Sequence, residues 1–213
     1  MKQLFSCFLF RKRPEDGLSA PRRAAFWLWN GLLMLGAALA LGLLCLMLAP
    51  AQYGWELFYD YFAHPALVAL NLLPPVVLMA LLFGLTGRAW LAYALTALPV
   101  LALAAANAYK MFFRDDPVIA ADLLLLGEAG NMAGKYQLFL FGKLAAALAC
   151  ALLSAALLAL LARGRPRARF RALTAGAALA CAAALAPLYA SDQAYQDNAS
   201  EEHINKWSVT QQH

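Results

Sequence analysis

Five long runs of apolar residues dominate the sequence and limit what the chain can fold into. They cover residues 24–49, 66–86, 89–108, 138–162 and 172–190, and none of them contains an acidic residue. A helix needs about 20 apolar residues to cross the hydrocarbon core of a bilayer. With 63% hydrophobic and 14% charged residues, the chain has more apolar surface than one small soluble domain could bury. The sequence therefore predicts an all-α polytopic membrane protein with five transmembrane helices.

Basic residues are distributed unevenly among the segments that flank these runs, and their distribution predicts an orientation. Three segments carry net charges of +4, +1 and +5: residues 1–23, 87–88 and 163–171. The alternate segments carry net charges of −2, −1 and −3: residues 50–65, 109–137 and 191–213. Cytoplasmic loops carry an excess of Lys and Arg. We therefore predict a plasma-membrane protein with a cytoplasmic arm at 1–23, a membrane domain at 24–190 and an extracellular juxtamembrane connector at 191–213.

Other classes of site are disfavoured by the sequence. Nucleic-acid binding is not expected despite the formal charge of +5, because the basic residues flank apolar runs instead of alternating with aromatic residues. The four cysteines show no C-x-x-C spacing, so they indicate neither a zinc site nor a disulfide framework. Glu201, Glu202 and His203 would point in different directions on a helix, and we interpret them as a solvated helix start. We assign no catalytic residue and no metal ligand to this chain.

Two features inside the runs bear on how the helices pack. Pro74, Pro75 and Pro99 each remove a backbone donor, which a membrane helix tolerates where its neighbours satisfy the freed carbonyl. The fifth run is mostly alanine, which supplies little transfer free energy. We therefore expect the preceding arginines and close packing of small residues to hold it in place. These small residues are Ala175, Gly176, Ala180, Ala183 and Ala184.

The segment 109–137 has the features of a short helix that does not cross the membrane. Asp116 followed by Pro117 is a favourable helix start, with an N-cap carboxylate and then a residue suited to the first turn. Ile119, Leu123 and Leu126 would share one apolar stripe. A helix ending near residue 130 is too short to span, so we predict an interfacial helix on the outer side.

Lys110 and Arg114 are four residues apart and would lie on one face if the third helix continued beyond the bilayer edge. Two cations at headgroup depth could bind a lipid phosphate, Arg through a bidentate fork and Lys as a point charge. Chemistry alone favours a simpler interpretation, an interfacial anchor or salt bridges from Arg114 to Asp115 or Asp122.

The same region resembles a known family. The pattern Asn107-x-x-Lys110-x-x-x-Arg114-x-x-Pro117-x-x-x-x-Asp122, followed by leucines and Glu128, resembles the end of the membrane domain in lipoteichoic-acid-synthase-like proteins. These proteins are membrane-anchored phosphoglycerol transferases of the sulfatase and alkaline-phosphatase superfamily. Residues 204–212 resemble the connector to their extracellular catalytic domain. The resemblance implies a membrane anchor and lipid-facing platform, with Asn107, Lys110, Arg114 and Asp122 near an anionic headgroup such as that of phosphatidylglycerol.

One departure from the family limits what is carried over. Catalysis in that family belongs to a large outer domain with a threonine nucleophile and a divalent metal, usually manganese. No residue here matches the nucleophile or the metal ligands, so this chain is expected to carry no cofactor. We expect a fragment that stops where the catalytic domain would begin; a natural short form is the alternative. A stand-alone small membrane protein, either a transporter or an assembly partner, is the competing function, although the scarcity of charges in the runs argues against ion-coupled transport.

Overall fold

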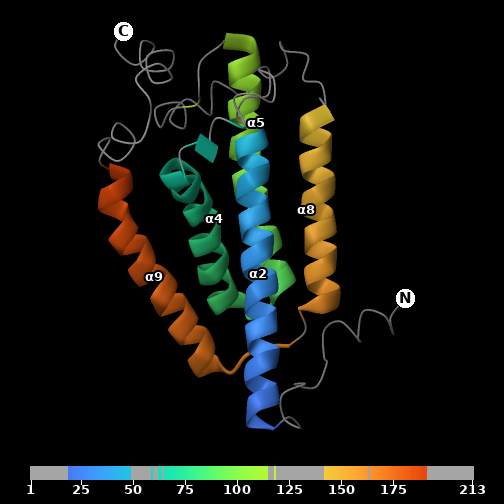
Figure 1. Ribbon diagram of the computed structural model, residues 1–213, viewed down its shortest axis with the longest axis vertical. Coiled ribbons are helices and arrows are strands. Elements are labelled where there is room, and N and C mark those ends of the chain that lie inside the picture. The colour runs from blue at the N-terminus through green and yellow to red at the C-terminus, as the bar shows by residue number, and fades with distance from the viewer. Residues whose placement is uncertain are drawn as a thin grey trace.

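Five long helices make up most of the described structure (Figure 1). The computed structural model describes residues 19–48, 59, 62–63, 65–114, 118, 142–162 and 164–190. The long helices are α2 (Ala20–Leu48), α4 (Pro65–Thr86), α5 (Ala89–Arg114), α8 (Gly142–Leu161) and α9 (Ala168–Ala190). Each is long and apolar enough to cross a membrane, with mean hydropathy from 1.7 in α9 to 2.6 in α8. Among the described residues, the prediction of an all-helical chain with five helices long and apolar enough to span a membrane is confirmed.

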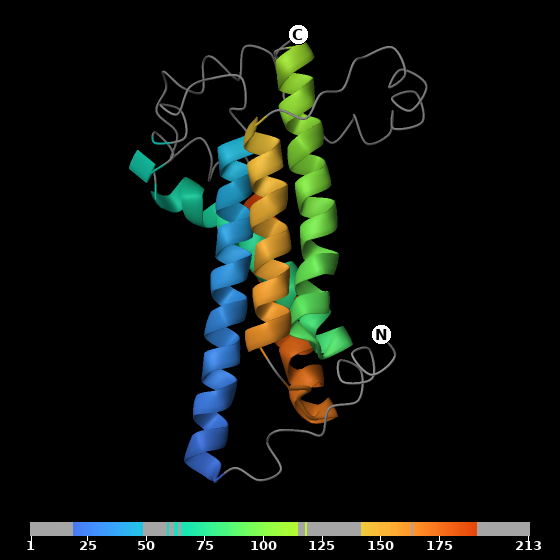
Figure 2. The same cartoon turned by 90° about the vertical axis from the view of Figure 1, so that its right-hand side faces the viewer.

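Consecutive helices run in opposite directions along the bundle (Figures 1 and 2). Helix α4 packs against α9, α5 and α2, while α8 packs against α5 and α2. The first residue of α2 and the last residue of α9 therefore point toward opposite ends of the bundle (Figure 1). The end that holds the start of α2, the α4–α5 turn and the start of α9 is called the arginine end below. The opposite end, where α5 finishes, is called the α5 end.

The apolar side chains are divided between a packed interior and a surface suited to lipid. The largest fully buried side chains are Tyr93, Leu41, Leu48, Met79, Met111 and Thr96. On the outside, Leu98, Leu152 and Leu173 are 75%, 72% and 70% exposed. Rows of exposed leucine are unfavourable in water, whereas lipid tails are as apolar as leucine itself. The burial pattern is therefore that of a bundle solvated by a bilayer.

Three polar side chains inside the spans are bonded to their own helices. The Asn30 and Asn71 amides donate to the carbonyls of Phe26 and Leu67, both at 2.8 Å. The Thr96 hydroxyl donates to the Ala92 carbonyl, also at 2.8 Å. Such bonds to the carbonyl four residues earlier keep polar groups satisfied where no water is available.

Helix α9 is fastened to α4 by close backbone packing and by a polar contact at each end. A Cβ atom added at Gly84 would lie 2.7 Å from the Ala175 Cβ and 2.8 Å from the Ala175 nitrogen. Of the small residues noted on the fifth run, Ala175 makes this contact, and the other four are exposed. Near the end of α9 the Tyr189 hydroxyl donates to the Leu70 carbonyl of α4, and near its start Arg171 donates to the end of α4.

Some sequence-based predictions lie outside the described residues. The interfacial helix was expected within 109–137, of which the structure describes the end of α5 and Val118. The cytoplasmic arm up to residue 18 and the connector 191–213, including Glu201, Glu202 and His203, are outside as well. Those predictions stand as they were.

Candidate functional site

The end of α5 extends beyond the other four helices, and it carries three of the four predicted headgroup residues (Figure 2). The third apolar run was expected to span 89–108, but the helix continues to Arg114. Lys110 and Arg114 therefore occupy positions one turn apart on a continuous helix, and Asn107 lies one turn before Lys110. This is the geometry that the lipid-site hypothesis requires of the backbone. Asp122 lies outside the described residues.

Asn107 ties Val118 back onto α5. Its Oδ1 accepts a hydrogen bond from the backbone N–H of Val118 at 2.9 Å, across eleven positions of sequence. Asn107 and Val118 are both half-buried. A backbone N–H at this depth needs an acceptor, because few waters compete for it. Asn107 thus holds the Val118 backbone beside α5.

Aromatic rings cover a different face of the same turns. The Tyr109 and Phe113 rings are stacked with centroids 6.5 Å apart, and Phe112 meets Phe113 edge-on at 5.2 Å. Phe112 and Phe113 are exposed, whereas Ala108 and Met111 are buried against the bundle. Exposed aromatic rings beside cations are typical of a helix that passes through the headgroup layer.

Lys110 is half-buried on the polar face of α5. A lysine in this place can lay its apolar stem along the helix and extend its ammonium toward the headgroups. The aromatic face therefore lies on the same last turns of α5 as the positions of Lys110 and Arg114. What this arrangement can do chemically is bind an anion at a membrane surface.

At the opposite end of the bundle, Arg171 caps helix α4. Its Nε donates to the Gly84 carbonyl at 3.1 Å, and its Nη2 donates to the Leu85 carbonyl. The last carbonyls of a helix have no partner within it, and a cation there also interacts favourably with the helix dipole. Beneath Arg171 lies Gly87, whose φ of +67° and close contact with the Arg171 side chain both favour glycine.

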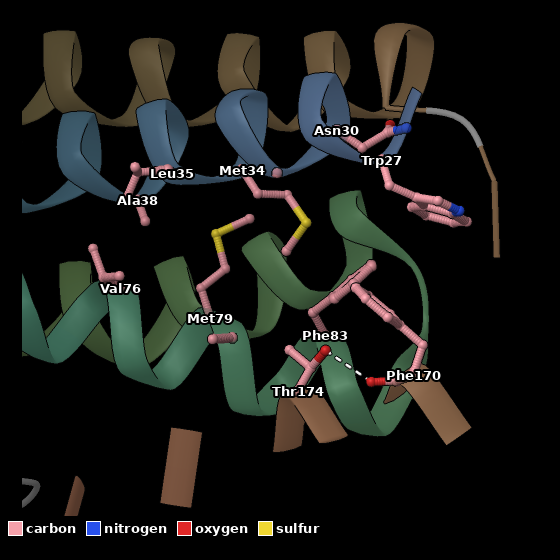
Figure 3. A pocket seen from close by; sticks show the side chains of 12 residues that line it. Trp27, Asn30, Met34, Leu35, Ala38, Val76, Met79, Phe83, Phe170 and Thr174 are labelled. Carbon is pink, nitrogen blue, oxygen red and sulfur yellow. Dashed lines mark hydrogen bonds between the residues drawn. The ribbon is translucent and has the colours of Figure 1, made fainter. Parts of the chain in front are cut away.

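A hollow opens between α2, α4 and α9 near the arginine end (Figure 3). It holds about 220 Å³ and is lined by six residues of α2, four of α4 and two of α9. Trp27, Phe83 and Phe170 gather at one end of it, and Met34 and Met79 lie farther in. Its polar members, Asn30 and Thr174, direct their donors to carbonyls of their own helices. This hollow is called the α2–α9 groove below.

Three features were not predicted from the sequence: the bond from Tyr189 to Leu70, the α4 cap by Arg171 and the α2–α9 groove. Only the first of them left a signal in the sequence. Pro74 is that signal in principle, since a proline inside a helix leaves the carbonyl four residues earlier without its helical donor, and Tyr189 supplies one here. The α4 cap by Arg171 could not be selected from the five arginines of the turn. The groove could not be found at all, because its lining comes from three helices far apart in sequence.

The described residues hold no group of three or more His, Cys, Asp or Glu side chains that could bind a metal ion. Cys45 is half-buried, and Cys150 and Cys181 are exposed on the bundle surface; all three are free thiols. All twelve acidic residues of the sequence lie outside the described ranges.

The described residues define a class of protein, a five-span helical membrane protein with a polar and aromatic helix end that projects from one side. No protein-family model, curated protein or solved structure matches the chain.

Proposed function

We propose that this chain is the membrane anchor and lipid-facing platform of a lipoteichoic-acid-synthase-like phosphoglycerol transferase of the sulfatase superfamily. Its catalytic domain, with the divalent metal, would lie outside this chain. The N-terminus is cytoplasmic, the C-terminus is extracellular, and the α5 end faces the outside of the cell membrane. There Asn107, Lys110, Arg114 and Asp122 contact the headgroup of an anionic phospholipid such as phosphatidylglycerol.

The observation that carries the proposal is the continuation of α5 to Arg114. A helix that stopped at residue 108 would leave Lys110 and Arg114 in a loop with no fixed relation. The continuous helix holds their backbone positions one turn apart, and the bond from Val118 to Asn107 brings the next segment alongside. Paired cations on a rigid element are well suited to phosphate.

Two further features support it. Five spans are an odd number, so the basic start of α2 and the end of α9 lie on opposite sides. The described arginines other than Arg114 gather at one end of the bundle, as the positive-inside rule expects of a cytoplasmic face.

The headgroup site can be tested with a local probe. In a cysteine-free background, Phe112→Cys carries a bimane fluorophore beside the site, and vesicles contain lipid that is spin-labelled on its headgroup. We expect spin-labelled phosphatidylglycerol to quench the probe more than spin-labelled phosphatidylcholine. Lys110→Gln with Arg114→Gln should reduce that preference about thirtyfold, at ~1 kcal/mol per basic residue near an anionic surface.

Lys143→Gln is the matched control, because Lys143 lies in the first turn of α8 at the same end of the bundle. If Lys143→Gln has the same effect as the double variant, the attraction is general surface charge and the assigned site is wrong. Equal quenching by the two lipids in the unsubstituted protein would also reject it.

Orientation has its own test. Single cysteines at Asn198 and Arg165 are treated with a membrane-impermeant thiol reagent in intact cells. Labelling at 198 and protection at 165 are expected. The reverse pattern, or labelling of neither, would remove the enzyme-anchor assignment. A stop codon directly after His213 in the gene would instead favour the stand-alone membrane protein.

A further inference from the structure

The α2–α9 groove combines an apolar interior with an open side and a cationic end. Helices α2 and α9 form its walls and α4 forms its floor, since α4 packs against both. Its volume of about 220 Å³ exceeds the roughly 150 Å³ of an apolar protein cavity that admits a benzene ring. The groove therefore has room for part of a hydrocarbon chain.

The chemistry of the lining suits a flexible hydrocarbon. Met34 and Met79 adapt their shape to an irregular guest (Figure 3). Gly31 lines the groove, and a Cβ atom added there would meet nothing within 4 Å. The donors of Asn30 and Thr174 are already engaged at 2.8 and 2.9 Å with carbonyls of their own helices. The lining thus presents an apolar surface, because the hydrogen-bond donors of Asn30 and Thr174 are already used.

The aromatic end of the groove faces the arginine end of the bundle. The Trp27 and Phe170 rings, from α2 and α9, stack with centroids 5.9 Å apart. Arg23 precedes Trp27 by four residues, and Arg167 precedes Phe170 by three. Arg23 therefore lies one turn before Trp27 on α2, and Arg167 directly precedes the first residue of α9.

We propose that the α2–α9 groove binds one acyl chain of an anionic glycerophospholipid, whose phosphate lies between Arg23 and Arg167. Charge complementarity selects this occupant. A lipid that bears a negative headgroup directly above its acyl chain satisfies the apolar groove and the cationic rim together. This site lies at the opposite end of the bundle from Lys110 and Arg114, and it does not depend on the function proposed above.

Trp27 provides a direct readout, because bromine on an acyl chain quenches a nearby indole. The full chain is prepared with Trp27 as its single tryptophan, with Trp29, Trp55, Trp90 and Trp207 replaced by Phe, and is reconstituted in vesicles. A second form keeps Trp29 alone, which is 56% exposed and does not line the groove. Each form receives the same small fraction of dibrominated phosphatidylglycerol or dibrominated phosphatidylcholine.

We expect Trp27 to prefer the brominated phosphatidylglycerol and Trp29 to show no preference. Arg23→Gln with Arg167→Gln should lower the preference at Trp27 by at least about fivefold. Arg88→Gln with Arg165→Gln removes the same charge from the same end of the bundle at positions that do not line the groove. This pair should leave most of the preference at Trp27 intact.

The groove itself is tested by a matched pair on α2. Gly31→Leu projects into the groove, whereas Gly36→Leu projects from the same helix into space that is equally free of protein atoms and does not line the groove. Gly31→Leu should reduce quenching at Trp27 to the level at Trp29, and Gly36→Leu should not. Circular dichroism checks that both variants are folded.

The opposite results would overturn the proposal. One such result is equal quenching of Trp27 by the two lipids. The others are a lipid preference that Gly31→Leu does not reduce, or a loss of that preference that is equal in the two pairs of arginine variants. Absence of quenching at Trp27 by either lipid would mean that protein covers the groove, either a second copy of the chain or one of its own segments.

Discussion

The Tyr189 hydroxyl donates to the Leu70 carbonyl, and Leu70 is the residue whose carbonyl Pro74 leaves without its helical donor. The carbonyl at position 70 would otherwise bond to the N–H of residue 74, which proline lacks. A side chain 119 positions away in sequence replaces that donor. The proline-containing turn of α4 and the last turn of α9 are therefore joined by this hydrogen bond.

Replacing Tyr189 with Phe removes this donor and should lower the free energy of unfolding. Hydrogen bonds between membrane helices contribute about 0.6 kcal/mol on average and up to about 1.7 kcal/mol. The measurement is denaturation in detergent or bicelles. In a Pro74→Ala background the backbone N–H returns to Leu70, so Tyr189→Phe should cost less there. Additive effects of the two substitutions would show that the carbonyl does not depend on Tyr189.

The α4–α9 contact at Gly84 leaves no room for a side chain. Gly84→Ala places a Cβ within 2.9 Å of three Ala175 atoms, two of them backbone, so α9 must shift. Overpacking of this kind costs about 1–3 kcal/mol. Gly176→Ala is the control, since its Cβ would meet nothing within 4 Å and alanine is the better helix former. Thermal unfolding should rank Gly84→Ala below the unsubstituted protein, and equal stability would contradict the packing.

Arg171 should matter more to stability than its neighbours in the same turn. Arg171→Gln loses the bonds to the Gly84 and Leu85 carbonyls, and we expect a loss of about 1 kcal/mol, because the side chain is half-exposed and solvent weakens the interaction. Arg167→Gln, at an exposed position, is the comparison. Chemical denaturation of both variants in detergent measures the difference. Equal losses would mean that net charge, not the α4 cap, sets the effect.

The bond between Asn107 and Val118 can be followed at the Val118 amide itself. Asn107→Ala removes the acceptor, and hydrogen exchange at that amide should accelerate about fivefold, the equivalent of about 1 kcal/mol. Asn107→Asp keeps an acceptor oxygen of the same reach and should retain protection. Exchange followed by mass spectrometry on peptides that contain Val118 reports the change. Fast exchange in the unsubstituted protein would show that the segment is not held by Asn107.

The number and type of the spans could be predicted from the sequence, because crossing a bilayer imposes a length and a composition that each segment must meet alone. The shared helix face of Lys110 and Arg114 could be predicted in the same way, because residues four apart lie on one face of any helix. The third apolar run was predicted to end at 108 and α5 continues to Arg114, because its last turns mix polar, aromatic and apolar residues and lack the uniform composition of a span.

Contacts between helices could not be predicted, because lipid and leucine are equally apolar and burial alone does not choose partners. The partner of Pro74 is Tyr189, and the partner of Gly84 is Ala175, from a helix that hydropathy ranks weakest of the five. The sequence by itself determined five segments that are long and apolar enough to cross a membrane, and the described residues form a helix in each of them. Only the tertiary structure decided that Tyr189 bonds to the Leu70 carbonyl, that Gly84 packs against Ala175 and that three helices line one groove. These contacts depend on shape and on hydrogen-bond donors that are brought together across the bundle.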